Sequence, residues 1–229
     1  MGIPAETASE SGKPRKRLKA EERRESILRA ANSVFGQHGY EHVRIDDVAA
    51  AAGISKALIY EHFRSKQELY VELMNRAAID LLGRIVAAAS APGVEGAARL
   101  EAGSKAGFGF VAEQPEAFQM FVRDVTDPEV AAVQAALRRG AVSAMVGVME
   151  MEPVATREGL ERRHLEQLAE MMVGGYYALA DWWLRNRESD IDELTAIQLS
   201  FMWIGLGRMQ RGERWSLASF GGKLAPEAG

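Results

Sequence analysis

The segment Arg44–Lys66 limits the possible folds of this chain more than any other segment. Its first half places apolar residues such as Ile45 and Val48 at helical spacing, and this pattern stops at Gly53. Glycine suits a sharp turn because it adopts a positive φ without a steric penalty. Ser55 then stands where its hydroxyl oxygen can accept a backbone N–H at the start of a second helix. The segment therefore predicts two short helices joined by a tight turn.

The second short helix, expected from Lys56 to about Phe63, has the features of a helix that enters the DNA major groove. Lys56 lies in its first turn, where an ammonium group can donate to O6 and N7 of guanine. The apolar side chains of Ala57 and Leu58 can contact thymine methyl groups. Either Leu58 or Ile59 must point inward, along with either His62 or Phe63, because one face of the helix has to pack against the core.

Further motifs occur in a fixed order and spacing on both sides of this segment. They are Ile27-Leu28, Ala30-Ala31, Phe35, Gly39-Tyr40, Ile45, Asp47-Val48-Ala49, Ala52-Gly53-Ile54-Ser55, Ile59-Tyr60, His62-Phe63, Ser65-Lys66 and Leu69. Together they resemble the DNA-binding domain of TetR-family transcriptional regulators over residues 20–70, under a quarter of the chain. The resemblance implies an all-α protein, with an N-terminal three-helix DNA-binding domain and a larger C-terminal helical domain for ligand binding and dimerisation. It also implies a homodimer on double-stranded DNA and a small-molecule effector.

The pattern of the second short helix and the family resemblance together assign DNA contacts to a short set of residues. They are Arg44, Ser55, Lys56, Ala57, Leu58, Tyr60, His62 and Lys66. Family members contact backbone phosphates at the positions of Tyr60, His62 and Lys66, and a core or surface role is the alternative for each. Arg44 departs from the family, which usually has a capping Thr or Ser there. An arginine has no acceptor with which to cap, so its side chain either reaches the DNA or lies on the surface.

The distribution of charge supports this assignment. The chain has a net charge of −4, which is unfavourable for a DNA-binding protein. Residues 1–66, however, contain 12 Lys/Arg and 9 Asp/Glu, a net charge of +3, whereas residues 67–229 contain 16 and 23, a net charge of −7. The positive charge is therefore concentrated in the proposed DNA-binding segment.

Composition excludes several classes of protein. The chain has no cysteine, which excludes disulfides, thiolate metal sites and cysteine nucleophiles and fits a cytoplasmic protein. It also lacks a run of about 18 apolar residues, so no membrane span is expected. His38 and His42 are separated by a helix-ending glycine, and Glu161-x-x-His164 lacks a second half. We therefore expect no metal site, no cofactor and no enzyme activity.

The chain is expected to divide into four segments. These are a disordered basic arm at 1–19, the helix-turn-helix domain at 20–66, a helical effector-binding and dimerisation domain at 67–212, and a C-terminal tail at 213–229. The basic arm either is simply solvated or follows DNA phosphates. The first helix is expected at about 21–37, and the later helices at about 66–90, 94–113, 116–125, 128–151, 157–187 and 191–211. Asp127 suits the N-cap of the helix at 128–151, and Asp190 or Asp192 suits the start of the helix at 191–211.

The last two helices predict a dimer interface. Both are apolar on nearly every side, and such a helix is buried on both sides. One side would pack the core and the other a second copy, in agreement with the four-helix interface that the resemblance implies. The alternative is that both sides are buried within one subunit. The residues assigned to the interface are Gly175, Ala178, Trp182, Phe201, Met202 and Gly205.

Aromatic and methionine side chains in the middle helices are candidates for an effector pocket. They either form ordinary core or line an adaptable apolar cavity, with the glycines of residues 103–109 leaving room. Arg123 would anchor an acidic ligand group, or else form a structural ion pair. The candidate pocket residues are Phe108, Phe110, Phe118, Phe121, Arg123, Met145, Met149, Met172 and Tyr176.

The sequence thus favours a DNA-binding transcriptional regulator, expected to be a repressor that a small, largely apolar effector releases from an inverted-repeat operator. The main alternative is a regulator of the same fold without an effector, whose larger domain serves only dimerisation or a protein partner. An all-helical enzyme is the remaining alternative, and the sequence shows no nucleophile–base pair, metal cluster or phosphate loop to support it.

Overall fold

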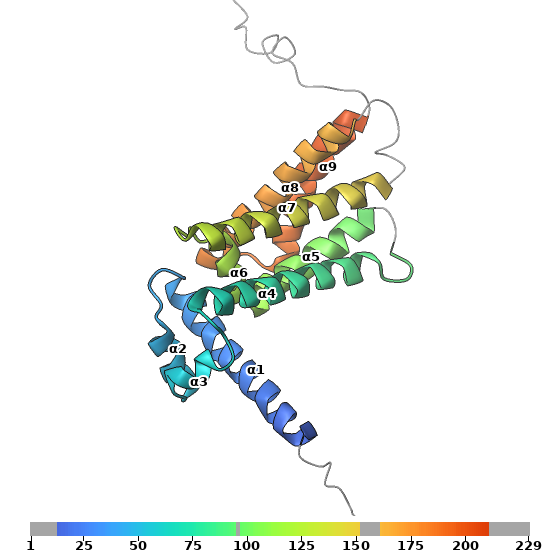
Figure 1. The fold of residues 1–229 in the computed structure, drawn as a ribbon. Helices are drawn as coiled ribbons and strands as arrows, with labels where there is room; N and C mark the ends of the chain where they lie inside the picture. The colour runs from blue at the N-terminus through green and yellow to red at the C-terminus, as the bar shows by residue number, and fades with distance from the viewer. Residues whose placement is uncertain (1–12, 95–96, 152–160, 211–229) are drawn as a thin grey trace, which may run out of the picture. The chain divides into compact units, whose positions relative to one another are not determined.

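The computed structural model describes residues 13–94, 97–151 and 161–210, which are helical with short connections and contain no strand (Figure 1). The predicted all-α fold is therefore confirmed. Contacts divide the chain into two compact units. The head unit contains the described residues of Met1–Asp80 together with Gln114–Ala135, and the body unit contains those of Leu81–Glu113 and Ala136–Gly229. The boundary predicted at residue 66 falls inside the head unit.

The head unit consists of three complete helices at the N-terminus, the beginning of a fourth, and two elements from later in the chain. These are α1 (Lys13–His38), α2 (Ile45–Ala52), α3 (Lys56–Tyr60), the first part of α4 (Lys66–Ala89), α6 (Pro115–Val122) and the first part of α7 (Pro128–Met151). Helix α2 packs against both α1 and α3.

Helix α1 begins earlier than expected. We predicted disorder up to residue 19 and a helix from about 21, but α1 starts at Lys13. The added residues are mainly Lys, Arg, Ala and Leu, which are strong helix formers, and Pro14 is tolerated in a first helical turn. Helix propensity therefore extends the first helix into the predicted arm. The remaining residues of the predicted arm, 1–12, lie outside the described part of the chain.

Aromatic side chains form the core of the head unit. The rings of Phe35 and Tyr70 meet edge to face with centroids 4.9 Å apart, and Tyr40 lies 5.0 Å from Tyr70. Ile59 of α3 and Phe63 just after it are also buried. Burial raises the pKa of Tyr70 to about 12. The burial of Ile59 and Phe63 fixes which side of α3 faces inward, so the opposite side of α3 faces solvent.

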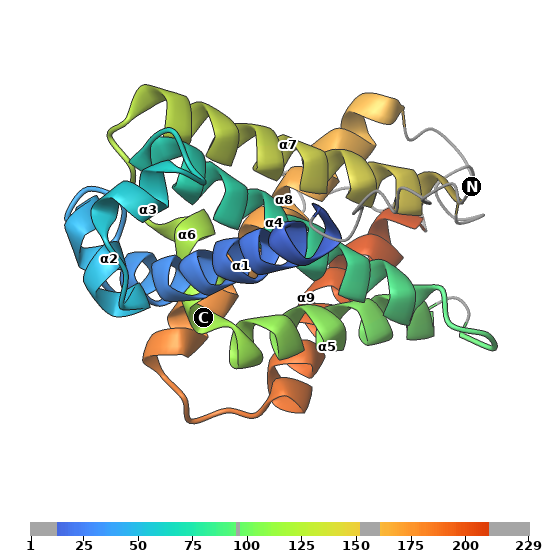
Figure 2. The ribbon, with the colours of Figure 1, turned by 60° about the horizontal axis from the view of Figure 1, so that its bottom comes forward.

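Helix α6 crosses α1 at very close range (Figure 2). A Cβ atom added to Gly36 would lie 2.2 Å from Cβ and 2.7 Å from Cα of Glu116. Because one of these atoms belongs to the backbone, the two helices can approach this closely only with glycine at residue 36.

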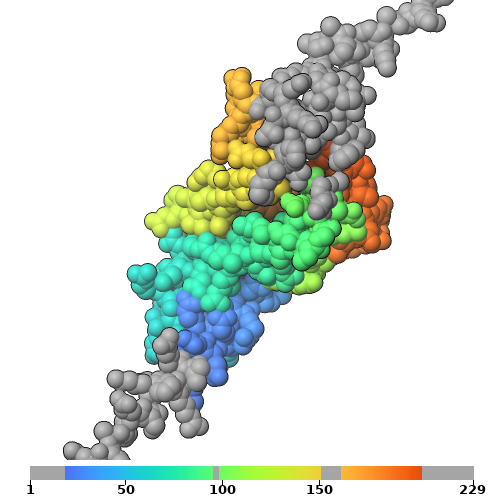
Figure 3. Space-filling view, turned by 90° about the vertical axis from the view of Figure 1, so that its right-hand side faces the viewer, coloured from blue at the N-terminus to red at the C-terminus, as the bar shows by residue number. Residues whose placement is uncertain are grey.

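The body unit contains the second part of α4, from Leu81, and the larger part of α7, from Ala136, together with three further helices. These are α5 (Ala97–Glu113), α8 (Arg162–Arg185) and α9 (Ile191–Gln210). The end of α4 lies against α5, where Ile85 is 3.4 Å from a Cβ position at Gly103, and the two surfaces adjoin in green in Figure 3. Among the described residues, no helix is long and apolar enough to cross a membrane.

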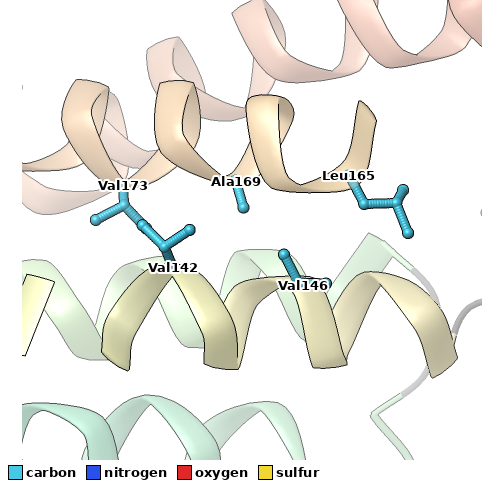
Figure 4. Packing of buried hydrophobic residues seen from close by; sticks show 5 residues of the cluster. All are labelled: Val142, Val146, Leu165, Ala169 and Val173. Carbon is cyan, nitrogen blue, oxygen red and sulfur yellow. The ribbon is translucent and has the colours of Figure 1, made fainter. Parts of the chain in front are cut away.

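Small aliphatic side chains join α7 to α8 in the body unit. Val142 and Val146 of α7 point toward α8, and three side chains of α8 point back toward α7 (Figure 4). The three residues of α8 are Leu165, Ala169 and Val173. Between α5 and α8, Phe108 packs on Tyr176 with ring centroids 5.1 Å apart. The body therefore has a packed apolar interior of its own.

Candidate DNA-binding surface

The turn between α2 and α3 has the predicted geometry. Gly53 has φ of +66°, in the left-handed region, and the N–H of Ile54 donates to the carbonyl of Ala49 at 3.0 Å. Nothing lies within 4 Å of an added Cβ at Gly53, so its positive φ and not a lack of space requires glycine. Ser55 caps α3 by accepting the N–H of Leu58 at 3.3 Å. The helix-turn-helix prediction is confirmed.

The inward side of α3 decides which predicted residues face solvent. Ile59 is buried, and so is Phe63 beyond the end of the helix, whereas Leu58 and His62 are half-buried. Of the alternatives left open by the sequence, Ile59 and Phe63 are therefore the inward pair. The predicted contact residues Ser55, Lys56, Ala57 and Tyr60 are exposed, with 47% of Tyr60 accessible.

Arg44 occupies the N-cap position of α2 but caps with its backbone alone. Its φ and ψ are −107° and 157°, and its N–H donates to the Asp47 carboxylate at 2.7 Å. The guanidinium group cannot accept a hydrogen bond. The Arg44 side chain is exposed and lies at the N-terminal end of α2. This is the end of a helix that favours a nearby phosphate.

Lys66 has a structural role that the sequence did not reveal. Its ammonium donates to the carbonyl oxygens of Tyr40 at 2.9 Å and Val43 at 3.2 Å, and it lies 4.0 Å from the centre of the Tyr40 ring. Lys66 therefore ties the connection between α1 and α2 to the start of α4. An ammonium has three N–H donors, so one donor of Lys66 is left for the predicted phosphate contact.

The head helices are also held by a cluster around Arg24. Its guanidinium forms an ion pair with Glu72 of α4 and lies 4.5 Å from the centre of the Phe63 ring. The hydrogen bond from Arg24 lowers the pKa of Glu72 below its usual range. Arg76 pairs with the same carboxylate and with Glu25 of α1. Three of these contacts join α1 to α4 or to Phe63. The two residues in each contact are far apart in the sequence, so no local sequence pattern predicts the contact.

The connection between α6 and α7 is fixed to the loop after α1. Tyr40 donates to Asp127 at 3.0 Å, and Glu41 accepts from the N–H and the hydroxyl of Thr126, both at 2.7 Å. These hydrogen bonds lower the pKa of Glu41. Asp127 also caps α7 as predicted, accepting the N–H of Val130 at 3.1 Å.

Arg123, for which the sequence leaves a ligand anchor or a structural ion pair open, forms hydrogen bonds within the head unit. It donates to the Gln37 carbonyl at 3.2 Å and to the Gln119 side chain at 3.0 Å. The guanidinium therefore joins α6 to the end of α1. A signal was available in the sequence, because Arg123 follows a short apolar helix and such a cation often binds carbonyl groups at helix ends.

The predicted pocket residues are divided between the two units. Phe118, Phe121 and Arg123 belong to the head unit. The remainder belong to the body unit, and they are Phe108, Phe110, Met145, Met149, Met172 and Tyr176. Phe108, Phe110 and Phe118 are fully buried. A groove of about 470 Å³ does lie along α7 and α8, with charged residues such as Arg139, Arg162 and Glu166 around it. It is lined by none of the predicted residues, and the apolar pocket stays a prediction.

Apolar side chains on α8 and α9 are exposed where the sequence predicts a dimer interface. Trp182 is 46% exposed, and Ile197 and Phe201 are 56% and 76% exposed. Gly175 and Ala178 are exposed as well, and Met202 is half-buried, while Gly205 lies outside the residues whose burial is described. Within the described residues, no group of three His, Asp or Glu side chains is placed to hold a metal ion.

Comparison with known proteins identifies related transcriptional regulators over most of the chain. Residues 27–73 match the model for bacterial regulatory proteins of the tetR family, and residues 97–205 match the tetracyclin repressor-like C-terminal domain. The chain is 30% identical over 197 residues to the HTH-type transcriptional activator FasR of Mycolicibacterium smegmatis, covering 84% of this chain and 87% of the relative.

Solved structures share the fold. A TetR-like transcriptional regulator from Rhodococcus sp. RHA1 has a TM-score of 0.67 and 25% identity, over 81% of this chain and 96% of that one. A SmeT–triclosan complex has a TM-score of 0.66 and 19% identity, over 80% and 91%. With both domain models matched and a relative aligned along most of its length, this chain belongs to the TetR family of DNA-binding transcriptional regulators.

Proposed function

We propose that the protein is a homodimer that binds an inverted-repeat operator through the exposed side of α2 and α3, and that a small, largely apolar effector releases it. The observation that carries the proposal is the anchored recognition helix. Ile59 is buried, and Lys56, Ala57 and Tyr60 are exposed on a helix that follows a glycine turn. This arrangement suits insertion of the first turn of α3 into the major groove.

The exposed side chains divide into two roles. Arg44 and Tyr60 donate to phosphates, which positions the protein on the duplex without reading sequence. Lys56 donates to guanine, and Ala57 contacts thymine methyl groups, which specifies the sequence. One such helix reads only a few base pairs. Two heads related by a two-fold axis read an inverted repeat, with half-sites about one helical turn apart or slightly more.

The exposed apolar residues of α8 and α9 support dimerisation by the body unit. Trp182, Ile197 and Phe201 are large apolar side chains exposed on two helices that contact each other, and exposed apolar surface of this kind often marks an interface. A second copy packed on this face would bury them. The predicted interface is therefore the one that we propose.

The effector acts by linkage. A ligand that binds better when the two heads are spaced incorrectly for DNA must weaken operator binding by the same factor. Couplings of about 1–3 kcal/mol change affinity by roughly 5–150-fold. Both α4 and α7 begin in the head unit and continue into the body unit, which provides two covalent routes for such coupling. Triclosan in the SmeT complex is a small ligand of that protein.

The sign of regulation depends on where the operator lies. We propose repression, which follows when the site overlaps a promoter, although FasR is named as an activator. A DNA-binding regulator of this bacterial family acts in the cytoplasm, and we propose that location here. The second candidate is a regulator without an effector, favoured by the full burial of Phe108, Phe110 and Phe118. Release of a labelled operator by a small molecule separates the two.

Substitution of the two proposed phosphate contacts is expected to change operator binding in different ways. Arg44→Gln removes a positive charge, so the slope of log affinity against log salt should flatten by about 0.9 per head. Tyr60→Phe removes a neutral hydrogen bond, so affinity should fall about fivefold per head with the slope unchanged. Fluorescence anisotropy with an operator duplex at several salt concentrations measures both effects.

Arg139→Gln is the matched control, since Arg139 is exposed in the body unit and carries the same charge. It should leave the salt slope within error of the wild type. A flattening that is equal for Arg44→Gln and Arg139→Gln would show that overall charge, and not the proposed surface, governs binding.

A further inference from the structure

The charged residue on the recognition helix is already paired inside the protein. The ammonium of Lys56, in the first turn of α3, lies 2.8 Å from a carboxylate oxygen of Asp46 in the first turn of α2. Their side chains are 48% and 61% exposed. The pair therefore bridges the two helices on the outer side of the helix-turn-helix.

Asp46 is not needed to cap α2. Its neighbour Asp47 does so, accepting the N–H of Arg44 at 2.7 Å. Two adjacent carboxylates thus have separate tasks, one toward the backbone of its own helix and one toward the side chain of the next. Exposed ion pairs contribute little to stability. An acidic side chain in the first turn of α2 also favours the helix dipole, but this effect requires no contact with Lys56.

We propose that Asp46 is a specificity-determining residue that acts through Lys56, because it allows the ammonium to bind neutral base acceptors but opposes its use on phosphates. The inference deepens the DNA-binding function proposed above and rests on it. Asp46 is a positioning residue in this scheme, since it touches Lys56 and not the DNA.

The physical basis is a difference between the two kinds of acceptor. An ammonium has three donors, so Lys56 keeps two when one is bound to Asp46. O6 and N7 of guanine are neutral acceptors and take those two donors without displacing the carboxylate. A phosphate carries a full negative charge, so a phosphate bound to Lys56 repels the nearby carboxylate of Asp46. Salt does not fully screen this repulsion, because the two charges are closer together than the Debye length of about 10 Å at 0.1 M salt.

Contact with a phosphate therefore exchanges one ion pair for another and leaves a carboxylate close to the DNA. Little is gained, so binding to arbitrary sequence is weakened. Contact with guanine adds hydrogen bonds to an ion pair that persists. Asp46 thus widens the gap between operator and non-operator DNA, and this gap, rather than affinity alone, determines whether a regulator finds its site.

The test compares Asp46→Asn with Glu61→Gln on two labelled duplexes, an operator selected by the wild type and a shuffled sequence. Glu61 is an exposed carboxylate at the end of α3 that is not paired with Lys56 in the described contacts, so its loss changes charge equally. With two pairs per dimer, Asp46→Asn should strengthen binding to the shuffled duplex about fivefold to tenfold beyond the control. It should also steepen the salt slope on that duplex by about 0.9 for each newly contacted phosphate.

Binding of the operator should rise less than twofold beyond the control, so the ratio between the two duplexes falls. In a Lys56→Gln background, Asp46→Asn and Glu61→Gln should become equivalent. The inference is overturned if Asp46→Asn matches Glu61→Gln on both duplexes, or if its excess effect persists without Lys56. If the wild type selects no operator, the proposed function fails and the inference fails with it, a result distinct from the first two.

Discussion

Phe201→Glu is expected to convert the protein into a monomer and to lower its operator affinity by at least about 100-fold. The magnitude follows from losing one of two linked DNA-binding heads. Linking two binding sites raises the affinity about 10²–10⁴-fold above that of either site alone. Phe201 is 76% exposed in the single chain. A glutamate there would become an unpaired charge buried in the proposed interface, which costs several kcal/mol.

Folding of the single chain should be unaffected, because exposed substitutions usually change stability by less than about 0.5 kcal/mol. Analytical ultracentrifugation measures the mass, and anisotropy with an operator duplex measures the affinity. Ser200→Glu is the matched control, since Ser200 is exposed next to Phe201 and points in a different direction around α9. It should remain dimeric. A Phe201→Glu variant that stays dimeric and binds the operator normally would place the interface elsewhere.

Gly36→Val is expected to lower the free energy of unfolding by about 3 kcal/mol or more. A first side-chain carbon at residue 36 would already lie 2.7 Å from Cα of Glu116, so α1 and α6 must separate to accept it. Valine adds two further carbons to a crossing that has no space for one. Helix propensity works in the opposite direction, because glycine in a helix is about 1 kcal/mol less favourable than alanine.

Gly83→Ala provides the control of opposite sign. Gly83 is exposed within α4, and nothing lies within 4 Å of an added Cβ. Its replacement should raise the free energy of unfolding by about 0.5–1 kcal/mol. Urea denaturation followed by circular dichroism measures both variants. If Gly36→Val is as stable as the wild type, the close crossing of α1 and α6 is wrong.

Local signals account for the parts of the fold that the sequence predicted. The turn at Gly53, the cap at Ser55 and the start of α7 at Asp127 depend on residues within a few positions, and the structure confirms each one. Asp190, one of two candidates for the start of α9, accepts the N–H of Glu193 at 2.8 Å. Such features follow from backbone chemistry, which acts over one helical turn.

Contacts between distant segments account for what the sequence did not predict. Lys66 reaches carbonyl groups more than twenty residues earlier, and Arg123 reaches Gln37 across 86 residues. The sequence leaves a structural role open for both residues, but it does not indicate which internal partners they bind. The pairing of Asp46 with Lys56 depends in the same way on the angle between α2 and α3. Gly36 was the available signal for the α1–α6 crossing, since a glycine inside a helix needs a reason.

Selection of bound sequences from random duplex DNA by the wild-type protein tests the central claim most directly. Sequence-specific binding by two heads predicts an inverted repeat, with half-sites about one helical turn apart or slightly more. Enrichment should be lost when Lys56→Gln and Ala57→Asp are combined on α3, because these residues are proposed to contact bases. Recovery of sequences without any shared motif, held only by salt-sensitive binding, would contradict the account.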